Sequence, residues 1–257
     1  MSLASTCIYE TDDDNSPMAG WAPRTERVPA RLVETRGWSN VYKFFTDEAI
    51  WPRGLPLSAV DTPTGDVADK LAVRECPIQQ GLANHSPDVD AIWRLLFDRE
   101  IIFRDEESVV LQPGAWSPFN SQSTWWWPMA WPLMYLPSTC SFRLTDIWRS
   151  FVAQRVLWAM GWSIAFHGAE VHQDRNQHDL LLDLRGEFAG YSKNDSVAAI
   201  LGALELDSDR VAIGRNMRVC YRALVQAGCF DEAELDLLSC WLSDVDSISS
   251  QRAGVGS

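Results

Sequence analysis

Three consecutive aspartates directly follow a short apolar segment at the start of the chain. Residues 2–9 have the composition of a short, largely buried strand, expected at the centre of a sheet, and two residues separate it from Asp12, Asp13 and Asp14. Like charges a few ångströms apart repel, and each raises the pKa of the others. This row of acids is therefore expected to face a positively charged partner.

A divalent cation is a suitable partner. Mg²⁺ and Mn²⁺ prefer carboxylate oxygens and usually complete their coordination with water and ligand phosphates. Because alternate side chains of an extended segment point to the same side, Asp12 and Asp14 are the predicted metal ligands. Asp13 points to the other side and is a candidate for substrate binding. The alternative is a solvated acidic loop, which is the commoner fate of a charge run.

Size and charge narrow the class of protein. A chain of 257 residues with 46% apolar residues can bury a substantial core, with room for a small helical part. It has no run of 18 apolar residues, so no membrane segment is predicted. The net charge of −13 disfavours nucleic acid and anionic membranes. A phosphorylated ligand can bind only where a metal ion or a cluster of arginines makes the local electrostatic potential positive.

Apolar patterning predicts an α/β region followed by helices. Strands are expected at residues 41–45, 89–97, 108–111, 124–127 and 163–166, and a helix at residues 145–160, ended by Gly161. The chain is expected to be helical from residue 176, with Asp231 and Glu234 capping the last helix. The predicted division is a core at residues 1–175, a helical region at residues 176–248 and a disordered tail at residues 249–257.

The tryptophans are unusually numerous. The chain has thirteen, and several cluster at residues 125–131. Flat rings suit sugar faces, because apolar C–H groups pack on the ring while the hydroxyl groups bond elsewhere. Most of the thirteen are expected in the core, and Trp126 is the candidate for sugar contact. Asn120 and Gln122 precede this cluster and offer donors and acceptors for a sugar, or alternatively close a turn.

Seven segments in order along nearly the whole chain resemble the STELLO family of glycosyltransferases. A fainter similarity is to the reversibly glycosylated polypeptides, which include UDP-arabinopyranose mutases. The similar segments are residues 9–15 (YETDDDN), 51–56 (WPRGLP), 79–82 (QQGL), 88–92 (DVDAI), 118–122 (PFNSQ), 143–149 (RLTDIWR) and 173–178 (QDRNQH).

The resemblance implies a GT-A fold, a mixed sheet flanked by helices in which a D-x-D motif binds Mn²⁺ or Mg²⁺ and a nucleotide diphosphate. Asp12 and Asp14 fall on that motif, and Asp146 falls on the second acidic motif, which supplies a base in inverting members. A downstream histidine completes the metal shell, with His178 the first candidate and His172 the second. No βα units precede the acids in this sequence, so the chain is expected to carry the half of a GT-A domain that binds the metal and the acceptor.

Each remaining candidate has a structural alternative. Asp146 is either a base or a helix cap, and His178 is either a ligand or a surface residue. Arg53, Arg143 and Arg149 can clamp phosphate or form ion pairs. Further candidates that bond sugar hydroxyls or cap a loop are Asp88 and Asp90.

The predicted function is metal-dependent transfer of a sugar from a nucleotide diphosphate donor, most simply a UDP-sugar, to a carbohydrate acceptor. The alternatives are a nucleotide-sugar mutase and a non-catalytic interaction module. The last follows from the family's association with a polysaccharide synthase in the Golgi, the compartment that the resemblance implies for an anchored relative.

Overall fold

The computed structural model describes the chain except residues 1–4, 63–64, 177 and 256–257. Within the described residues, eight strands form the main sheet, with the order β1-β9-β6-β10-β7-β3-β5 and β2 beside β10. The strands are β1 (Ile8–Thr11), β2 (Asn15–Pro17), β3 (Arg27–Val33), β5 (Val67–Glu75), β6 (Ile78–His85), β7 (Val109–Leu111), β9 (Ser123–Trp126) and β10 (Ile164–Gln173). A small second sheet pairs β4 (Gly37–Trp38) with β8 (Ala115–Trp116).

Strands β6 and β10 form a parallel pair at the middle of the main sheet. On its other side, β10 pairs antiparallel with β7 through Ile164–Phe166 and with β2 through Val171–Gln173. The register of β10 against β6 shifts between these two parts. Because β6 and β10 run in the same direction, their carboxyl ends meet at one edge of the sheet, where β1 also ends.

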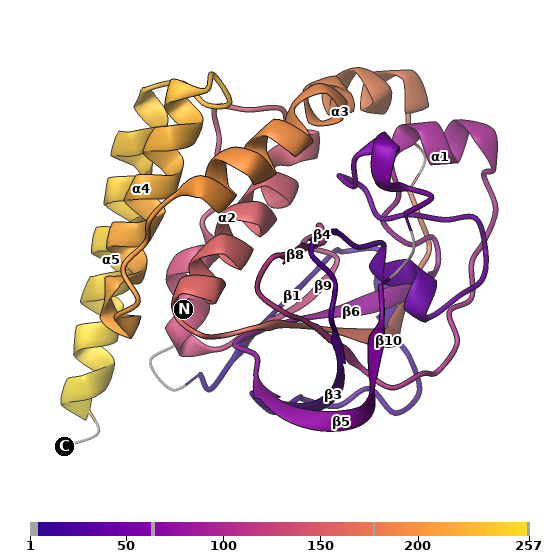
Figure 1. Cartoon of the computed structure of the whole chain (residues 1–257), viewed down its shortest axis with the longest axis horizontal. Coiled ribbons are helices and arrows are strands. Elements are labelled where there is room, and N and C mark those ends of the chain that lie inside the picture. The colour runs from indigo at the N-terminus through magenta and orange to yellow at the C-terminus, as the bar shows by residue number, and fades with distance from the viewer. Residues whose placement is uncertain (1–4, 63–64, 177, 256–257) are drawn as a thin grey trace.

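The helices gather on one side of the sheet (Figure 1). They are α1 (Ala91–Leu96), α2 (Thr145–Ala159), α3 (Leu180–Ala203), α4 (Ile213–Gln226) and α5 (Ala233–Val255). Buried side chains of the sheet, of α2 and of α4 and α5 belong to a single hydrophobic cluster that includes Ile164, Phe151, Tyr221 and Leu242. The C-terminal helices therefore share the core of the sheet instead of forming a separate one.

The opposite face of the sheet is only partly covered. Side chains alternate along β10, so that Phe166 joins the helical core while Ala165 joins a small cluster with Val28 and Val110. The segment between β2 and β3 lies over this face, and its residues 18–25 line a cavity together with Gln79 and His167. Among the described helices, none combines the length and apolarity needed to cross a lipid bilayer.

The predicted mixed α/β architecture with a helical C-terminal part is confirmed. Strand predictions at residues 108–111, 124–127 and 163–166 coincide with β7, β9 and the start of β10. The predicted helix coincides with α2, and Gly161 follows it with a φ of 72°. Each of these elements has either a clear apolar periodicity or clear turn residues at its ends. Both features are visible in the sequence alone, so these elements could be predicted.

Two predicted strands are wrong. The apolar segment at residues 41–45 contains a 3₁₀ helix, η1 (Val41–Phe44), and residues 91–96 of the segment 89–97 form α1. Asp90 caps α1 by accepting a hydrogen bond from the backbone N–H of Trp93, at 2.8 Å. Short buried apolar runs have no period that separates strand from helix, so the cap and the surrounding packing decide.

Three further expectations differ from the structure. Strand β1 lies at the edge of the sheet and not at its centre. Glu234 does not cap α5, because its carboxylate accepts hydrogen bonds from residues 135–139 instead. Helix α5 continues to Val255, whereas a disordered tail is predicted from Ser249.

Candidate functional site

A pocket of about 490 Å³ lies where β1, β6 and β10 end. Asp12, Asp13 and Asp14 follow β1, Asp88 follows β6, and His178 follows β10. The carboxyl ends of parallel strands are the usual place for ligands in open α/β sheets. The volume of this pocket is also within the range of about 300–1,000 Å³ that is typical of small-molecule sites.

The acidic loop, Asp12–Asp14, carries more negative charge than the neighbouring basic side chains neutralise. Asp14 accepts a hydrogen bond from the Gln173 side chain at 3.0 Å. Burial raises the pKa of Asp12 to about 7, and the charges of Asp88, Asp14 and Asp146 add to this effect against the opposing charge of Arg53. A cation placed at Asp12 would stabilise its charged form.

A buried ion triplet forms the floor of this pocket. The guanidinium of Arg53 donates to Asp146 through Nη1 at 2.9 Å and Nη2 at 2.6 Å, and to Asp88 through Nε at 2.8 Å. Asp146 also accepts from the backbone N–H of Ile147, at 3.0 Å. Burial opposes ionisation of Asp146, but Arg53, and after it Arg149 and Arg143, outweigh burial and hold the pKa of Asp146 below its usual value.

Acids of α3 hold the basic side chains at the other wall. Glu187 accepts from Arg143 at 2.6 Å, and Asp183 accepts from Arg175 at 3.3 Å. His178 Nδ1 lies 3.2 Å from the carboxylate of Asp183. These contacts hold three side chains, Arg143 from one segment and Arg175 and His178 from another, against the same helix.

Ten of the predicted site residues line this one pocket. They are Asp12, Asp13, Asp14, Arg53, Asp88, Asn120, Gln122, Arg143, Asp146 and His178. Sequence reasoning missed Arg94 and Arg175, which also line it. Arg175 lies in the same polar segment as His178, and that proximity is the one signal that could have identified it.

Four predicted residues lie elsewhere. Asp90 caps α1 and accepts from Trp51 Nε1. Trp126 is fully buried, and the guanidinium of Arg149 lies 4.9 Å from its ring centroid. Arg149 is itself buried and donates to Glu10 at 2.9 Å and to Ser121 Oγ at 3.0 Å, so it braces the pocket wall from behind. His172, the second metal candidate, packs against His85 instead.

The donor set suits a metal that shares its coordination with a ligand. Within the described residues, no group of three or more His, Cys, Asp or Glu side chains is placed to enclose a metal ion. Mg²⁺ is commonly bound by one or two carboxylates, with water and substrate phosphates completing the octahedron. Asp12 and Asp14, with their unbalanced charge, fit this kind of open site.

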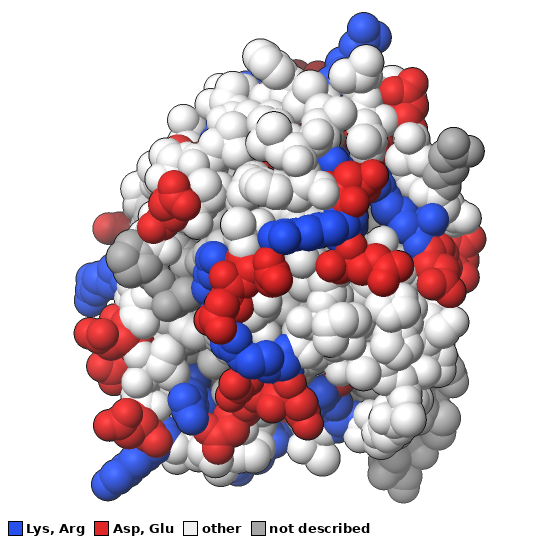
Figure 2. Space-filling model, turned by 90° about the vertical axis from the view of Figure 1, so that its right-hand side faces the viewer, with Lys and Arg blue, Asp and Glu red and all other residues white. Residues whose placement is uncertain are grey.

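Several exposed arginines outside the pocket form ion pairs with acidic side chains. Arg31 pairs with Glu107, Arg99 with Glu48 and Arg104 with Asp47, each at 2.6 Å. On the face shown in Figure 2, basic and acidic side chains likewise lie interleaved instead of gathering into areas of one sign. This face therefore offers no broad basic surface of the kind that binds a nucleic acid backbone.

Comparison with known proteins points to one family. Residues 143–253 match the family model of the STELLO glycosyltransferases. Over 228 residues, 83% of this chain, the sequence is 28% identical to the Arabidopsis thaliana protein named Probable glycosyltransferase STELLO1. Over 146 residues, 52% of this chain, it is 35% identical to the one named Probable glycosyltransferase STELLO2.

The chain spans less than a third of the length of either relative, since the aligned regions are 28% of STELLO1 and 18% of STELLO2. The resemblance carried by the segments at residues 9–15 and 143–149 agrees with these matches. The family model and both relatives agree that this chain is similar to the STELLO glycosyltransferases.

Proposed function

We propose that this protein transfers a sugar from a nucleotide diphosphate donor to a carbohydrate acceptor, and that the reaction depends on a divalent metal. The observation that carries the proposal is the meeting of the acidic loop, Asp12–Asp14, with Arg143, Arg175 and His178 in one pocket at the carboxyl ends of the strands. Similarity to the STELLO glycosyltransferases supports the same reaction class.

The negative charge of the donor's diphosphate determines which residues would bind the donor. A diphosphate cannot approach three carboxylates without positive charge between them. Asp12 and Asp14 would hold Mn²⁺ or Mg²⁺, which when bound neutralises the diphosphate as it leaves. Arg175, half-buried on the opposite wall and paired through Nη2 with Asp183, would contact a phosphate oxygen from the other side.

The acceptor would lie against the polar wall formed by Asn120 and Gln122. The backbone N–H of Asn120 donates to Gln80 at 2.8 Å, and the backbone N–H of Gln122 donates to Asn120 Oδ1 at 2.9 Å, so this wall is held in one conformation. Such fixed amide groups can bond sugar hydroxyls without ordering new segments.

Asp146 is better suited to positioning than to proton abstraction. Both of its oxygens accept hydrogen bonds from Arg53, and its lowered pKa makes it a weak base. We therefore assign it the task of orienting Arg53 and the loop that carries Asp88.

The proposal predicts that Mn²⁺ together with UDP stabilises the protein. At ligand concentrations of about 100 times the dissociation constant, the gain is about 2.7 kcal/mol, which raises the melting temperature by roughly 5–10 °C. The double substitution Asp12→Asn, Asp14→Asn should abolish this shift in a thermal melt, because it removes both carboxylates from the metal.

A matched control is Asp244→Asn with Asp246→Asn, which removes the same charge from exposed positions of α5 and should keep the shift. If Mn²⁺ and UDP fail to stabilise the unmutated protein, this chain does not bind the donor, and the non-catalytic interaction module becomes the better interpretation. Release of UDP from a panel of UDP-sugars then tests transfer directly.

Asp146→Asn separates the two roles of that residue. We expect the substitution to lower the free energy of unfolding by about 3 kcal/mol, because it leaves buried Arg53 without its bidentate partner. Chemical denaturation measures this loss. A variant with unchanged stability and an intact Mn²⁺–UDP shift, but without UDP release from UDP-sugars, would instead make Asp146 the base.

A further inference from the structure

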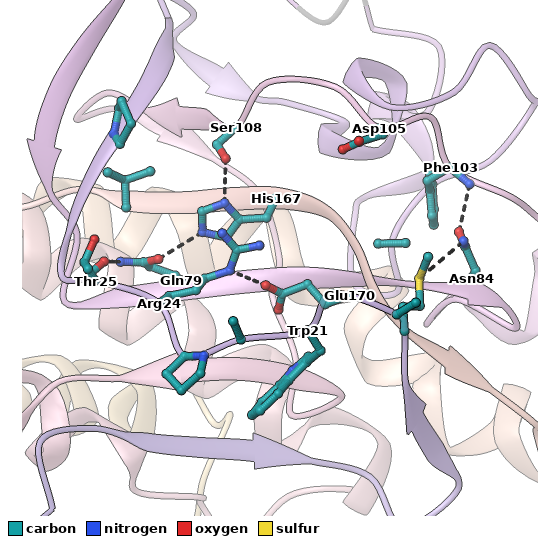
Figure 3. Close-up of a pocket in the computed structure, with 18 of the residues that line it drawn as sticks. Trp21, Arg24, Thr25, Gln79, Asn84, Phe103, Asp105, Ser108, His167 and Glu170 are labelled. Atoms are coloured by element: carbon teal, nitrogen blue, oxygen red, sulfur yellow. Dashed lines mark hydrogen bonds and ion pairs between the residues drawn. The ribbon is translucent and has the colours of Figure 1, made fainter.

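A second cavity, of about 680 Å³, lies on the face of the sheet opposite the helices. Its floor is formed by β6 and β10, and its roof by the segment between β2 and β3, which carries Trp21, Arg24 and Thr25 (Figure 3). It shares no lining residue with the pocket at the acidic loop. A ligand bound here would thus be separate from the proposed reaction site.

The floor is polar and rigid. Gln79 donates through Nε2 to the backbone carbonyls of Thr25 and Cys76, so its Oε1 is left to accept from His167 Nε2 at 3.0 Å. His167 Nδ1 then accepts from the Ser108 hydroxyl at 2.6 Å. Burial, together with the charge of Arg24, lowers the pKa of His167 well below its usual value, so the imidazole stays neutral. This chain of hydrogen bonds fixes the floor in one arrangement.

Trp21 provides an aromatic wall whose direction is also fixed. Its ring stacks on Trp125 with centroids 5.3 Å apart, and it meets Tyr9 edge to face at 5.4 Å. The side chain nevertheless remains 38% exposed, and it lines the cavity. A large aromatic ring that is held on one side and open on the other can pack against the apolar face of a ligand.

Two donors at this cavity lack good acceptors. Asn84 is only 4% exposed, and its Oδ1 accepts from the backbone N–H of Phe103 at 2.9 Å. Among the residues that the structure describes, its Nδ2 has the thioether sulfur of Met18 as its one acceptor, at 3.7 Å, and sulfur is a weak acceptor. Arg24 donates through Nε to Glu170, and no hydrogen bond within the described part of the chain uses its two Nη atoms. A buried donor with so poor a partner favours a ligand that brings oxygen atoms.

We propose that this cavity is a carbohydrate-binding site, distinct from the proposed reaction site. A pyranose ring would pack its C–H face on Trp21, while its hydroxyl oxygens accept from Asn84 Nδ2 and from Arg24 Nη. Its hydroxyl protons can be donated to Asp105, an exposed carboxylate that also lines the cavity. A carbohydrate carries both donors and acceptors and can therefore satisfy groups of both kinds.

Other ligand classes fit less well. A purely apolar molecule would leave the Asn84 and Arg24 donors without acceptors. A phosphate or other compact anion would face the carboxylates of Glu170 and Asp105 in a protein of net charge −13. The proposal stands on these contacts and does not require that the acidic loop bind a nucleotide sugar.

The test begins with the full chain on an array of immobilised neutral and acidic oligosaccharides. The neutral ligand that binds best is then titrated while the Trp21 indole N–H resonance is followed, assigned as the one that disappears in Trp21→Phe. We expect this resonance to shift on binding. Trp21→Ala should weaken binding at least about fivefold, and Asn84→Asp, which keeps the acceptor for Phe103 but removes the donor, should also weaken it.

Controls separate this site from the other pocket and from general loss of structure. Asp12→Asn with Asp14→Asn should leave carbohydrate affinity unchanged, whatever the outcome with Mn²⁺ and UDP. Trp158→Ala removes a half-buried ring of α2 outside the cavity and should also leave it unchanged. Absence of array binding, no change of the Trp21 resonance, or equal affinity in Trp21→Ala would overturn the proposal.

Discussion

Arg53→Met is expected to lower the free energy of unfolding by about 3–5 kcal/mol, because it leaves the buried carboxylate of Asp146 and the half-buried one of Asp88 without their counterion. Arg53 is buried and donates to both Asp88 and Asp146. The methionine can fill much of the vacated volume but cannot bond either carboxylate. For a chain of this size the loss corresponds to a fall in melting temperature of roughly 10 °C, which differential scanning calorimetry measures.

The pH dependence of this effect follows from the direction of the Asp146 pKa. In the unmutated protein the folded-state pKa is lowered, so the stabilisation is complete above the unfolded value near 3.8 and is lost as the pH falls through the folded value. Without Arg53 the folded-state pKa of Asp146 should rise, because burial is then opposed by the smaller effects of Arg149 and Arg143 alone. The gap between variant and unmutated protein should therefore be widest near pH 7 and narrow toward pH 4.

The matched control is Arg99→Met, which removes an arginine from an exposed pair with Glu48. Exposed pairs contribute about 0–1 kcal/mol, so this variant should melt close to the unmutated protein. Equal losses in the two variants, or a loss for Arg53→Met that does not change with pH, would contradict the description of the triplet as a buried ionic unit.

Glu234→Ala is the second substitution with a large expected effect. Glu234 lies in α5, has no exposed surface and accepts hydrogen bonds from the Tyr135 hydroxyl and from the backbone N–H groups of Ser138 and Thr139. The Thr139 hydroxyl donates to it as well, at 2.6 Å. Removing the carboxylate leaves several buried donors unpaired, and we expect a loss of about 3–5 kcal/mol in denaturant unfolding.

This substitution should also disturb the candidate site, because residue 136 of the same loop lines that pocket. Glu232→Ala is the control, since Glu232 is exposed and only two residues away. It should change the free energy of unfolding by less than about 0.5 kcal/mol. If Glu234→Ala is equally mild, the loop at residues 135–139 is held mainly by its apolar packing and not by the carboxylate.

Part of the candidate site could be predicted because the residues that carry it stand at recognisable boundaries. The acids at residues 12–14 end an apolar segment, and Asp146 opens a helix whose apolar positions recur at helical spacing. Their partners could not be predicted. Arg53 meets Asp146 across 93 residues of sequence, and Arg143 meets Glu187 across 44. No local sequence pattern predicts contacts between residues so far apart in the chain.

Other errors have the same origin. Trp126 lies in a sequence cluster of tryptophans that suits sugar binding, yet it is buried beneath Arg149. The ring that is exposed at a cavity belongs to Trp21, which lies far from that cluster in the sequence. Pairing of β9 between β1 and β6 decides which tryptophans are covered. The segment at residues 89–97 is apolar enough for a strand, but Asp90 caps it as a helix.

By itself the sequence determined the class of fold, the helical C-terminal part and the position of the acidic loop, because these depend on local periodicity and on residues that begin or end elements. The tertiary structure alone decided which charges neutralise one another and which are left unbalanced at Asp12. It also placed a second cavity on the far face of the sheet. The physical reason is that burial and ion pairing depend on distances between segments far apart in the chain, and these are fixed only when the sheet and helices pack.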